Sequence, residues 1–311
     1  MITFLLQAFL LAVAIDLFFG EPKAKYHPVV WIGTFIGFLK EHPPKRFKVL
    51  YGFIIAFLTI GLTVAIGYGV TVILYQVSPL IALLVTAFLL KSTFSLSFLW
   101  SISKDIYDDL KSGNFDSAKA KLPALVGRNV SKLNGDQMSS CVVESLGESF
   151  VDGIFAPLFY FALFGLPGAL AYRAINTLDS MVGYKDEKHR QIGMASARID
   201  DVANYIPARL SVILITGLGT LIGNPIRALK VAFRDARNTP SINSGWPMAA
   251  YAGSLGVRLE KIGYYVLGEG LKPVQVQDIP RAIGFNKALC LTLVLIIVLV
   301  MYFTQFPLTG F

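Results

Sequence analysis

The sequence is poor in charge and in cysteine, and each shortage excludes a class of protein. Only 15% of its 311 residues are charged while 54% are hydrophobic, and the mean hydropathy of +0.60 lies outside the range of soluble globular domains. Two cysteines, Cys141 and Cys290, stand far apart in no CxxC or Cys/His spacing, which excludes a disulfide framework and a structural zinc site. We therefore expect a polytopic membrane protein.

Nucleotide-binding and nucleic-acid-binding signatures are also missing. The sequence has no GxxxxGK[ST] P-loop, and the GLGTLIG run at 217–223 lies in an apolar segment with no strand before it, so it is not a dinucleotide fingerprint. The net charge is +8, but the Lys and Arg residues are spread over loops between apolar runs. The positive-inside rule explains this excess, and we expect no nucleic-acid partner.

Four apolar segments approach the roughly 20 residues that a helix needs to cross a bilayer. They are residues 2–19, 51–75, 79–100 and 287–306. The first has no basic n-region and no small-residue cleavage site, so we interpret it as a retained span. Two further runs, 154–166 and 210–222, are shorter, which is more typical of re-entrant or buried helices. The predicted fold is an all-α polytopic membrane protein with about four full spans, two short apolar helices and a cytoplasmic helical region.

Basic residues predict the orientation in the membrane. Loop 20–49 carries six Lys or Arg residues, whereas the 76–78 turn and both termini carry none, which predicts that this loop is inside and the N-terminus outside. We expect three parts: 1–100 with spans 1–3 and the cytoplasmic loop, a cytoplasm-facing catalytic region over 101–285, and a C-terminal span over 286–311. The catalytic region would include short apolar helices at 154–172 and 207–223; if both crossed the bilayer, the segment between them would lie outside.

Two acidic patterns suggest chemistry. Glu144, Glu148 and Asp152 recur every four residues, so a helix places them along one face, where like charges destabilise it unless a divalent cation or an arginine lies between them. A solvated acidic stripe is the structural alternative. Residues 176–201 are a polar island in an apolar chain, with four aspartates and flanking arginines: Asp179, Asp186, Asp200, Asp201, Arg173, Arg190, Arg198 and Arg209.

Carboxylates hold Mg²⁺ through oxygen ligands, and guanidinium groups bind phosphate in a forked geometry. The island therefore contains the parts needed for phosphoryl chemistry without a P-loop, or else a salt-bridged loop that fixes the fold. Asp16 ends the first span and His27 follows a Gly-Glu-Pro turn; His27 lacks His or Cys partners at ligand spacing. Asn243 and Trp246 lie in a turn that could grip a flat polar ligand, while an interfacial tryptophan anchor is the alternative.

The central run ESLGESFVDGIFAPLFYFALFGLPGALAYRAINTLDSMVGYKDEKHRQIGMASARIDDVANYIPARL resembles the adenosylcobinamide-phosphate synthase family of cobalamin biosynthesis, the CobD/CbiB type. The stretches DLFFGEPKAKYHPVVWIG, LVGRN and DARNTPSINSGWPMAAYAGSLGVRL carry the same resemblance, which runs from about residue 16 to 285. Asn129, Ser149 and Met248 stand where the family commonly has Asp, Asn and Glu, so we assign those three positions no direct role.

The resemblance implies a multi-pass cell-membrane enzyme with its active site facing the cytoplasm. It would form an amide between adenosylcobyric acid, a corrinoid substrate, and aminopropanol phosphate or aminopropanol, with ATP and Mg²⁺. Its partners would include the lipid bilayer and other membrane-bound enzymes of cobalamin assembly. On this basis we predict catalytic residues Glu144, Glu148, Asp179 and Asp200; Mg²⁺ ligands Glu148, Asp152, Asp179 and Asp201; and substrate-binding residues Arg173, Asn176, Arg198, Arg209, Asn243, Trp246 and His27.

Two other functions compete with this one. A membrane prenyltransferase is suggested by N-x-x-D in NTLD with downstream Asp186, although the usual close Asp spacing is missing. A transporter would show inverted repeats and ionisable residues near the bilayer midplane, whereas here no repeat is evident and the charges gather in loops and at helix ends.

Overall fold

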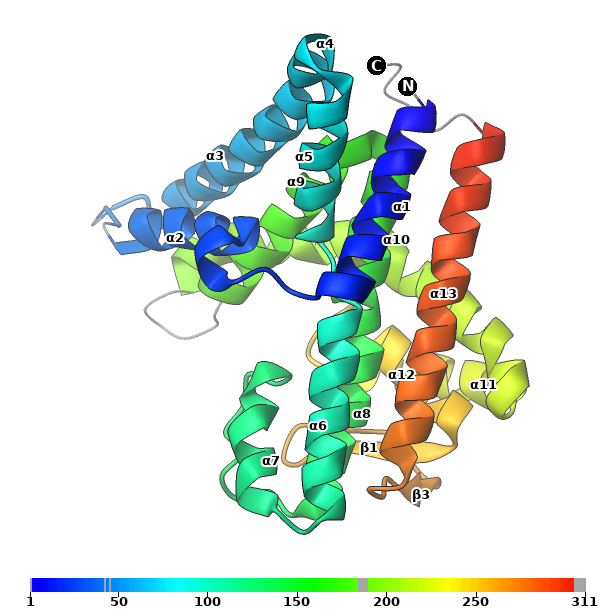
Figure 1. Ribbon diagram of the computed structural model, residues 1–311. Helices are drawn as coiled ribbons and strands as arrows, with labels where there is room; N and C mark the ends of the chain where they lie inside the picture. Colours follow the sequence, from blue (N-terminus) through cyan, green and yellow to red (C-terminus); the bar gives the residue numbers. More distant parts are fainter. Residues whose placement is uncertain (1, 42, 45, 184–189, 305–311) are drawn as a thin grey trace. The chain divides into compact units, whose positions relative to one another are not determined.

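The computed structural model describes residues 2–41, 43–44, 46–183 and 190–304, and they are almost entirely helical (Figure 1). Contacts divide the chain into two compact units. Unit 1 comprises Met1–Ser95, Ala156–Ala203 and Leu295–Phe311, and unit 2 comprises Leu96–Phe155 and Asn204–Val294. The two units are defined by contacts within the chain. The predicted division into 1–100, 101–285 and 286–311 concerns the position of each part relative to the membrane, and it stays a prediction.

Unit 1 is built from apolar helices. They are α1 (Ile2–Phe19), α2 (Pro28–Glu41), α3 (Lys48–Tyr68), α5 (Pro79–Lys91), α9 (Ala156–Val182) and the first part of α10 (Arg190–Ile222), with the short turns η1 (Ala24–Tyr26), η2 (Gly69–Leu74) and α4 (Tyr75–Val77). Helix α2 lies inside the predicted loop 20–49. Two glycines of α3 allow close helix contacts: a Cβ at Gly67 would lie 2.8 Å from the Pro167 backbone of α9, and one at Gly52 would lie 2.2 Å from the Ile192 carbonyl of α10.

Unit 2 combines helices with a small sheet. Its elements are α6 (Ser97–Lys111), α7 (Phe115–Lys121), η3 (Leu122–Ala124), α8 (Gly135–Phe150), η4 (Val151–Phe155), α11 (Pro225–Asp235), η5 (Ala236–Asn238), α12 (Gly245–Leu255), and most of α13 (Asp278–Thr304). Strands β1 (Val257–Lys261), β2 (Tyr265–Leu267) and β3 (Lys272–Pro273) pair in the order β2-β1-β3. The sequence did not predict this sheet, because the three strands are too short to show a clear alternation of apolar and polar residues.

The all-α multi-pass fold is confirmed. Among the described residues, four helical stretches are long and apolar enough to cross a membrane: Lys48–Val77, Gly135–Val182, Gln191–Ile222 and Asp278–Phe303. The set differs from the four segments counted above, because helix continues into polar sequence on both sides of the apolar run 154–166 and on the N-terminal side of the run 210–222. Gly165, with φ 66 and ψ −157, interrupts the first of these within α9, just before Pro167.

The apolar segment 79–100 is not one helix, contrary to our expectation. Helix α5 ends at Lys91, and α6 begins only at Ser97. The hydroxyls of Ser92 and Thr93 donate to the carbonyls of Leu89 and Leu90, which competes with the continuation of the helix. The residues counted as one span therefore form a 13-residue apolar helix, a turn and the start of an amphipathic helix.

Helices α6 and α7 form a helical hairpin. Gly113, between them, has the left-handed conformation, with φ +78. The N-cap of α7 is Asn114, whose side chain accepts from the Ser117 amide, and Asp116 lies in the first turn of that helix.

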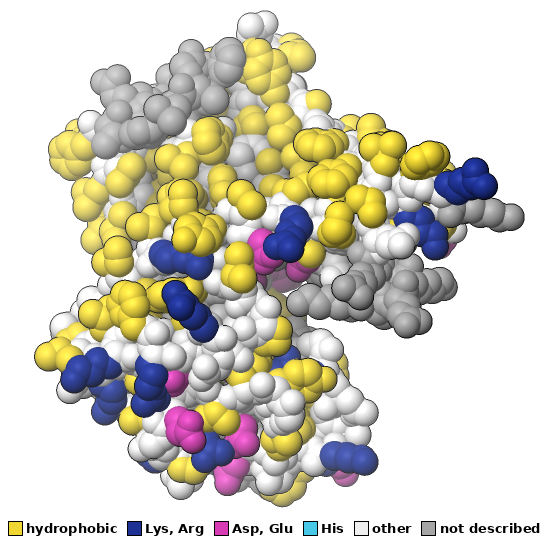
Figure 2. Space-filling view, turned by 180° about the vertical axis from the view of Figure 1, so that it is seen from behind, with side chains coloured by type: hydrophobic (Ala, Val, Ile, Leu, Met, Phe, Trp, Pro, Cys, Tyr) yellow, Lys and Arg dark blue, Asp and Glu magenta, His cyan; other side chains and the backbone are white. Residues whose placement is uncertain are grey.

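Broad hydrophobic patches cover part of the face drawn in Figure 2, and Lys and Arg side chains stand between them singly or in small groups. Exposed large apolar side chains on α3 include Phe57 at 67% and Leu50 at 59%. Such surfaces are rare in water-soluble monomers but suit helices that face lipid.

Candidate functional site

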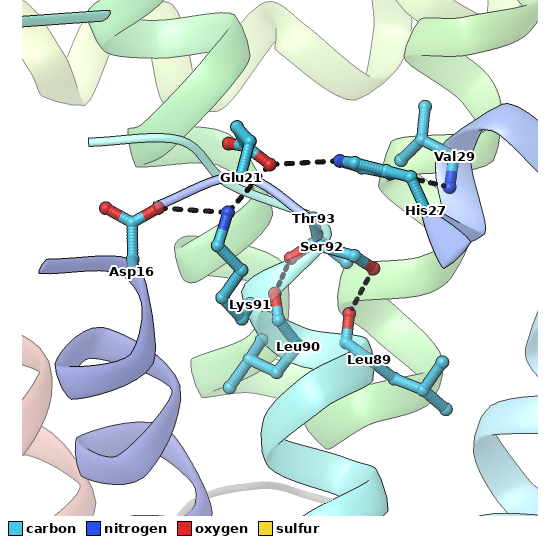
Figure 3. Close-up of polar contacts among 9 residues, drawn as sticks. All are labelled: Asp16, Glu21, His27, Val29, Leu89, Leu90, Lys91, Ser92 and Thr93. Carbon is cyan, nitrogen blue, oxygen red and sulfur yellow. Dashed lines mark hydrogen bonds and ion pairs between the residues drawn. The ribbon is translucent and has the colours of Figure 1, made fainter. Parts of the chain in front are cut away.

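A lysine lies fully buried between two carboxylates in unit 1 (Figure 3). The Lys91 ammonium at the end of α5 is 3.1 Å from Asp16 Oδ1 and 2.7 Å from Glu21 Oε2. The side chains of Lys91 and Asp16 have no exposed surface, and that of Glu21 is 24% exposed. Burying charges is costly unless they are paired, so the two carboxylates stabilise the ammonium and tie the ends of α1 and α5 together.

His27 extends this network. Its Nε2 lies 3.0 Å from Glu21 Oε2, and its Nδ1 accepts a hydrogen bond from the Val29 amide (Figure 3). Because Nδ1 is an acceptor, the ring proton is on Nε2 and His27 donates to Glu21. Burial raises the pKa of Glu21, but hydrogen bonds from His27 and Lys91 outweigh it and lower that pKa to about 2. His27, predicted to bind substrate, has both ring nitrogens engaged within the protein.

Of these four residues, the sequence pattern pointed to Asp16 and His27 but not to Lys91 and Glu21. A signal for Lys91 was available, because an ionisable residue inside an apolar run is a functional candidate by default. Its partners are 75 and 70 positions away in the sequence, so only the fold brings the four groups together.

The acidic stripe of unit 2 lies where it was predicted, along α8 and η4. Glu144 is buried, at 4% exposure, while Glu148 and Asp152 are half-buried. An arginine partly relieves the like-charge repulsion: Arg128 Nη2 lies 3.5 Å from Glu144 Oε2. A divalent cation and an arginine were considered above as the positive group that separates these carboxylates. The structure places an arginine beside Glu144.

Tyr265 of β2 completes the surroundings of Glu144. Its hydroxyl donates to Glu144 Oε1 at 2.9 Å. Burial raises the pKa of Tyr265, and the negative charge of Glu144 raises it further, so the phenol stays a protonated donor. Arg128 Nη2 also lies 2.8 Å from the buried Cys141 Sγ. Glu144 is therefore held by neighbours, and Glu148 and Asp152 are the members of the stripe with exposed surface.

Three predicted residues lie together near the end of α9 in unit 1. Arg173 Nη1 donates to Asn176 Oδ1 at 3.3 Å, one turn before Asp179. Gly183 follows the last residue of α9 and lies close to the Asp179 side chain: a Cβ at this glycine would lie 2.2 Å from Asp179 Oδ1. Lys40 of α2 donates to the Met181 carbonyl at 2.8 Å and so caps the same helix end.

Helix α10 carries the other half of the polar island. Asp200 and Asp201 are half-buried in unit 1, and Arg198 beside them is exposed. Asp186 and Arg190 were part of the predicted island; Asp186 lies outside the described residues, and so does the Arg190 side chain. The Asp-rich motif considered for a prenyltransferase therefore has only its NTLD half described.

Arg209, Asn243 and Trp246 meet in unit 2. The Arg209 guanidinium donates to Asn243 Oδ1, to the Ile242 carbonyl at 3.1 Å and to the Tyr205 carbonyl at 3.0 Å. It also lies 3.8 Å over the Tyr205 ring and 5.3 Å from the Trp246 ring. The structure brings these three predicted residues together, but protein carbonyls and rings hold the guanidinium that was expected to bind phosphate.

The predicted metal ligands are divided between the units. Glu148 and Asp152 belong to unit 2, and Asp179 and Asp201 to unit 1. Within the described part of the chain, no group of three or more His, Cys, Asp or Glu side chains is assembled for a metal ion. A Mg²⁺ held mainly by substrate phosphates would need only one or two carboxylates from the protein.

The fold and these clusters define a class of protein: an all-α multi-pass membrane protein that keeps paired carboxylates and cations among its apolar helices. The chain belongs to the CobD/CbiB family, because the family model described as CobD/Cbib protein matches residues 9–287.

Curated relatives carry names of the same family. A "Probable cobalamin biosynthesis protein CobD" of Methanothrix thermoacetophila is 43% identical over 88% of this chain and 90% of that protein. "Cobalamin biosynthesis protein CobD" of Dehalococcoides mccartyi is 38% identical over 97% and 99%. "Cobalamin biosynthesis protein CbiB" of Salmonella arizonae is 37% identical over 89% and 91%. No solved structure matches the chain.

Proposed function

We propose that this protein is an adenosylcobinamide-phosphate synthase of cobalamin biosynthesis. It would join adenosylcobyric acid to aminopropanol phosphate, or to aminopropanol, through an amide bond and at the expense of ATP. The observation that carries the proposal is the family match over residues 9–287, together with relatives named for cobalamin biosynthesis at 37–43% identity.

The reaction makes two chemical demands. A carboxylate does not react with an amine until it is activated, most simply by taking the γ-phosphoryl group of ATP to give an acyl phosphate and ADP. The amine then attacks the acyl carbon and inorganic phosphate leaves. Because an ammonium is not a nucleophile, a base must first accept its proton.

The half-buried end of the acidic stripe, Glu148 and Asp152, suits the role of the base that accepts this proton. Glu148 is one helical turn from Glu144, whose carboxylate is held by Tyr265 and Arg128 and is therefore not free to move toward a substrate. We assign the proton transfer to Glu148, with Asp152 beside it to attract the ammonium of the incoming amine. Glu144 then acts as a positioning residue that keeps a negative charge on the same helix face.

The polar island of unit 1 suits the phosphate-bearing substrates. Arg198 is an exposed guanidinium, and Arg173 with Asn176 offers paired donors next to Asp179. These residues would hold the phosphates of ATP or of aminopropanol phosphate, and Asp179, Asp200 or Asp201 would provide one or two oxygen ligands for a Mg²⁺ that arrives with them. The metal would neutralise charge on the transferred phosphoryl group.

The direct test uses purified full-length protein in detergent, supplied with adenosylcobyric acid, aminopropanol phosphate, ATP and Mg²⁺. We expect adenosylcobinamide phosphate and stoichiometric ADP, both identified by mass spectrometry. Folded protein that makes no product would overturn the proposal. Consumption of an isoprenyl diphosphate, or substrate uptake into vesicles without product, would point to the prenyltransferase or the transporter instead.

A variant pair separates the phosphate site from the fold. Asp179→Asn removes one negative charge with little change in shape, and we expect it to abolish turnover while the protein still melts at the wild-type temperature. Asp116→Asn is the matched control, since Asp116 is exposed on α7 and has no assigned role. Full activity of Asp179→Asn would remove Asp179 from the site.

A further inference from the structure

Helix α11 packs through only one of its faces. Its buried residues are Ala228, Val231, Ala232 and Asp235, which recur at helical spacing. This face lies against α12, where the approach is close: a Cβ at Gly253 would lie 2.6 Å from the Ala228 Cα. Small side chains on both helices thus allow the contact.

The opposite face of α11 is exposed and carries two parallel stripes. Ile226, Leu229 and Phe233 form an apolar stripe with 64%, 42% and 66% exposure. Beside it, Lys230 and Arg234, followed by Arg237 of η5, form a basic stripe. Lys230 and Arg237 are exposed, and the half-exposed Arg234 guanidinium also pairs with Asp235 at 2.6 Å. Large apolar side chains on a well-packed soluble helix would turn inward, so an exposed apolar stripe next to a basic one needs an environment that accepts both.

The position of α11 in the chain points to that environment. Helix α10 is long and apolar enough to span a membrane and ends at Ile222. Only Gly223 and Asn224 separate it from Pro225, the first residue of α11, and the Asn224 side chain caps α11 by accepting from the Arg227 amide. A helix that begins so soon after a span lies within reach of the lipid headgroups.

An aromatic pair supports the same placement. Phe233 meets the half-buried Trp246 edge to face, with ring centroids 5.4 Å apart. The Arg209 guanidinium also lies near that indole. Tryptophan is enriched at the boundary between acyl chains and headgroups, where its amphipathic ring is favourable. This pair links the apolar stripe to the anchor considered for Trp246.

We propose that α11 lies in the plane of the membrane surface, with its apolar stripe among the acyl chains and its basic stripe on the phosphates of anionic lipids. Charge complementarity selects anionic headgroups, because the basic stripe faces outward beside the apolar one. This contact would hold α11 of unit 2 against the bilayer, where a broad, partly apolar substrate could reach the protein. The proposal does not depend on the reaction assigned above.

The test measures where the helix lies in lipid. Leu229→Cys, labelled with a thiol-reactive fluorophore, is placed in the full-length protein and reconstituted into vesicles of phosphatidylcholine with phosphatidylglycerol. Both native cysteines are buried, so unlabelled wild-type protein is the reactivity control. We expect several-fold stronger quenching by a nitroxide on the lipid chain than by aqueous iodide. Phe115→Cys is the matched control, an exposed apolar position on α7, and should show the reverse.

A charge variant tests the choice of lipid. Lys230→Glu should weaken lipid quenching at position 229 in vesicles that contain phosphatidylglycerol and leave it unchanged in pure phosphatidylcholine; Lys132→Glu, at another exposed lysine, should have no effect. If iodide quenches position 229 as strongly as position 115, the proposal is wrong. Shielding from iodide without quenching by the lipid nitroxide would mean that a second protein surface covers the stripe, and would overturn it as well.

Discussion

The two units bury ionised side chains in opposite ways. In unit 1 a cation is enclosed by acids: Lys91 has no exposed surface and contacts Asp16 and Glu21. In unit 2 an acid is enclosed by donors: Glu144 is held by Arg128 and Tyr265. The first network closes around its lysine, whereas the second continues along the helix to the half-buried Glu148.

On the proposed assignment, this difference separates a structural cluster around Lys91 from a reactive one around Glu148. A substrate in water cannot reach an ammonium with no exposed surface, so the network around Lys91 fixes helix ends. A carboxylate stripe that is neutralised at one end and partly exposed at the other can exchange protons with a substrate. If the proposed assignment of Glu148 holds, the same chemistry of paired charges gives rigidity in one unit and a site for reaction in the other.

The largest effect is expected from Lys91→Met, which leaves two buried carboxylates without their cation. Removing one partner of a buried pair costs about 3–5 kcal/mol, so the protein should unfold at a markedly lower temperature in detergent, or fail to accumulate. Lys104→Met is the control, because the Lys104–Asp108 pair is 68% and 49% exposed and such pairs contribute about 0–1 kcal/mol. An unchanged melting temperature for Lys91→Met would contradict the structural role.

The next effect concerns the pH dependence of Glu21→Gln. The folded pKa of Glu21 is about 2 against an ordinary 4.5, so its ionised form stabilises the fold by about 3 kcal/mol above pH 4.5. Since the folded pKa is the lower one, this stabilisation is lost as the pH falls from 4.5 toward 2. The melting temperature of the variant should therefore be lower than that of the wild type at neutral pH, and the difference should shrink in acid. A difference that is constant with pH would rule out this cause.

A smaller effect is expected from Tyr265→Phe, which removes one hydrogen bond to Glu144. The loss should be about 1–2 kcal/mol, measured by thermal melting, because the carboxylate keeps Arg128 as a partner. Tyr264→Phe is the matched control on the neighbouring residue, whose ring is 72% exposed, and should melt like the wild type. Equal melting of both variants would show that the hydroxyl of Tyr265 does not support Glu144.

The parts of the site that lie on single helices could be predicted from the sequence. The spacing of Glu144 and Glu148 is enough to put them on one face, and the family followed from local motifs that the family model confirms. Long-range pairing could not be predicted: neither Lys91 with Asp16 nor Tyr265 with Glu144 shares a local pattern. Helix length could not be read from apolar run length either, because a helix continues into polar sequence when packing supports it, as in α10, where Ile192 lies against Gly52.

The central claim is that Glu148 takes part in the chemistry while Lys91 does not. The direct measurement is the single-turnover rate of adenosylcobinamide phosphate formation by Glu148→Gln, with its melting temperature in the same preparation. Loss of a positioned base should lower the rate by about 10²–10⁴-fold with the melting temperature unchanged. A wild-type rate in folded Glu148→Gln would contradict the account.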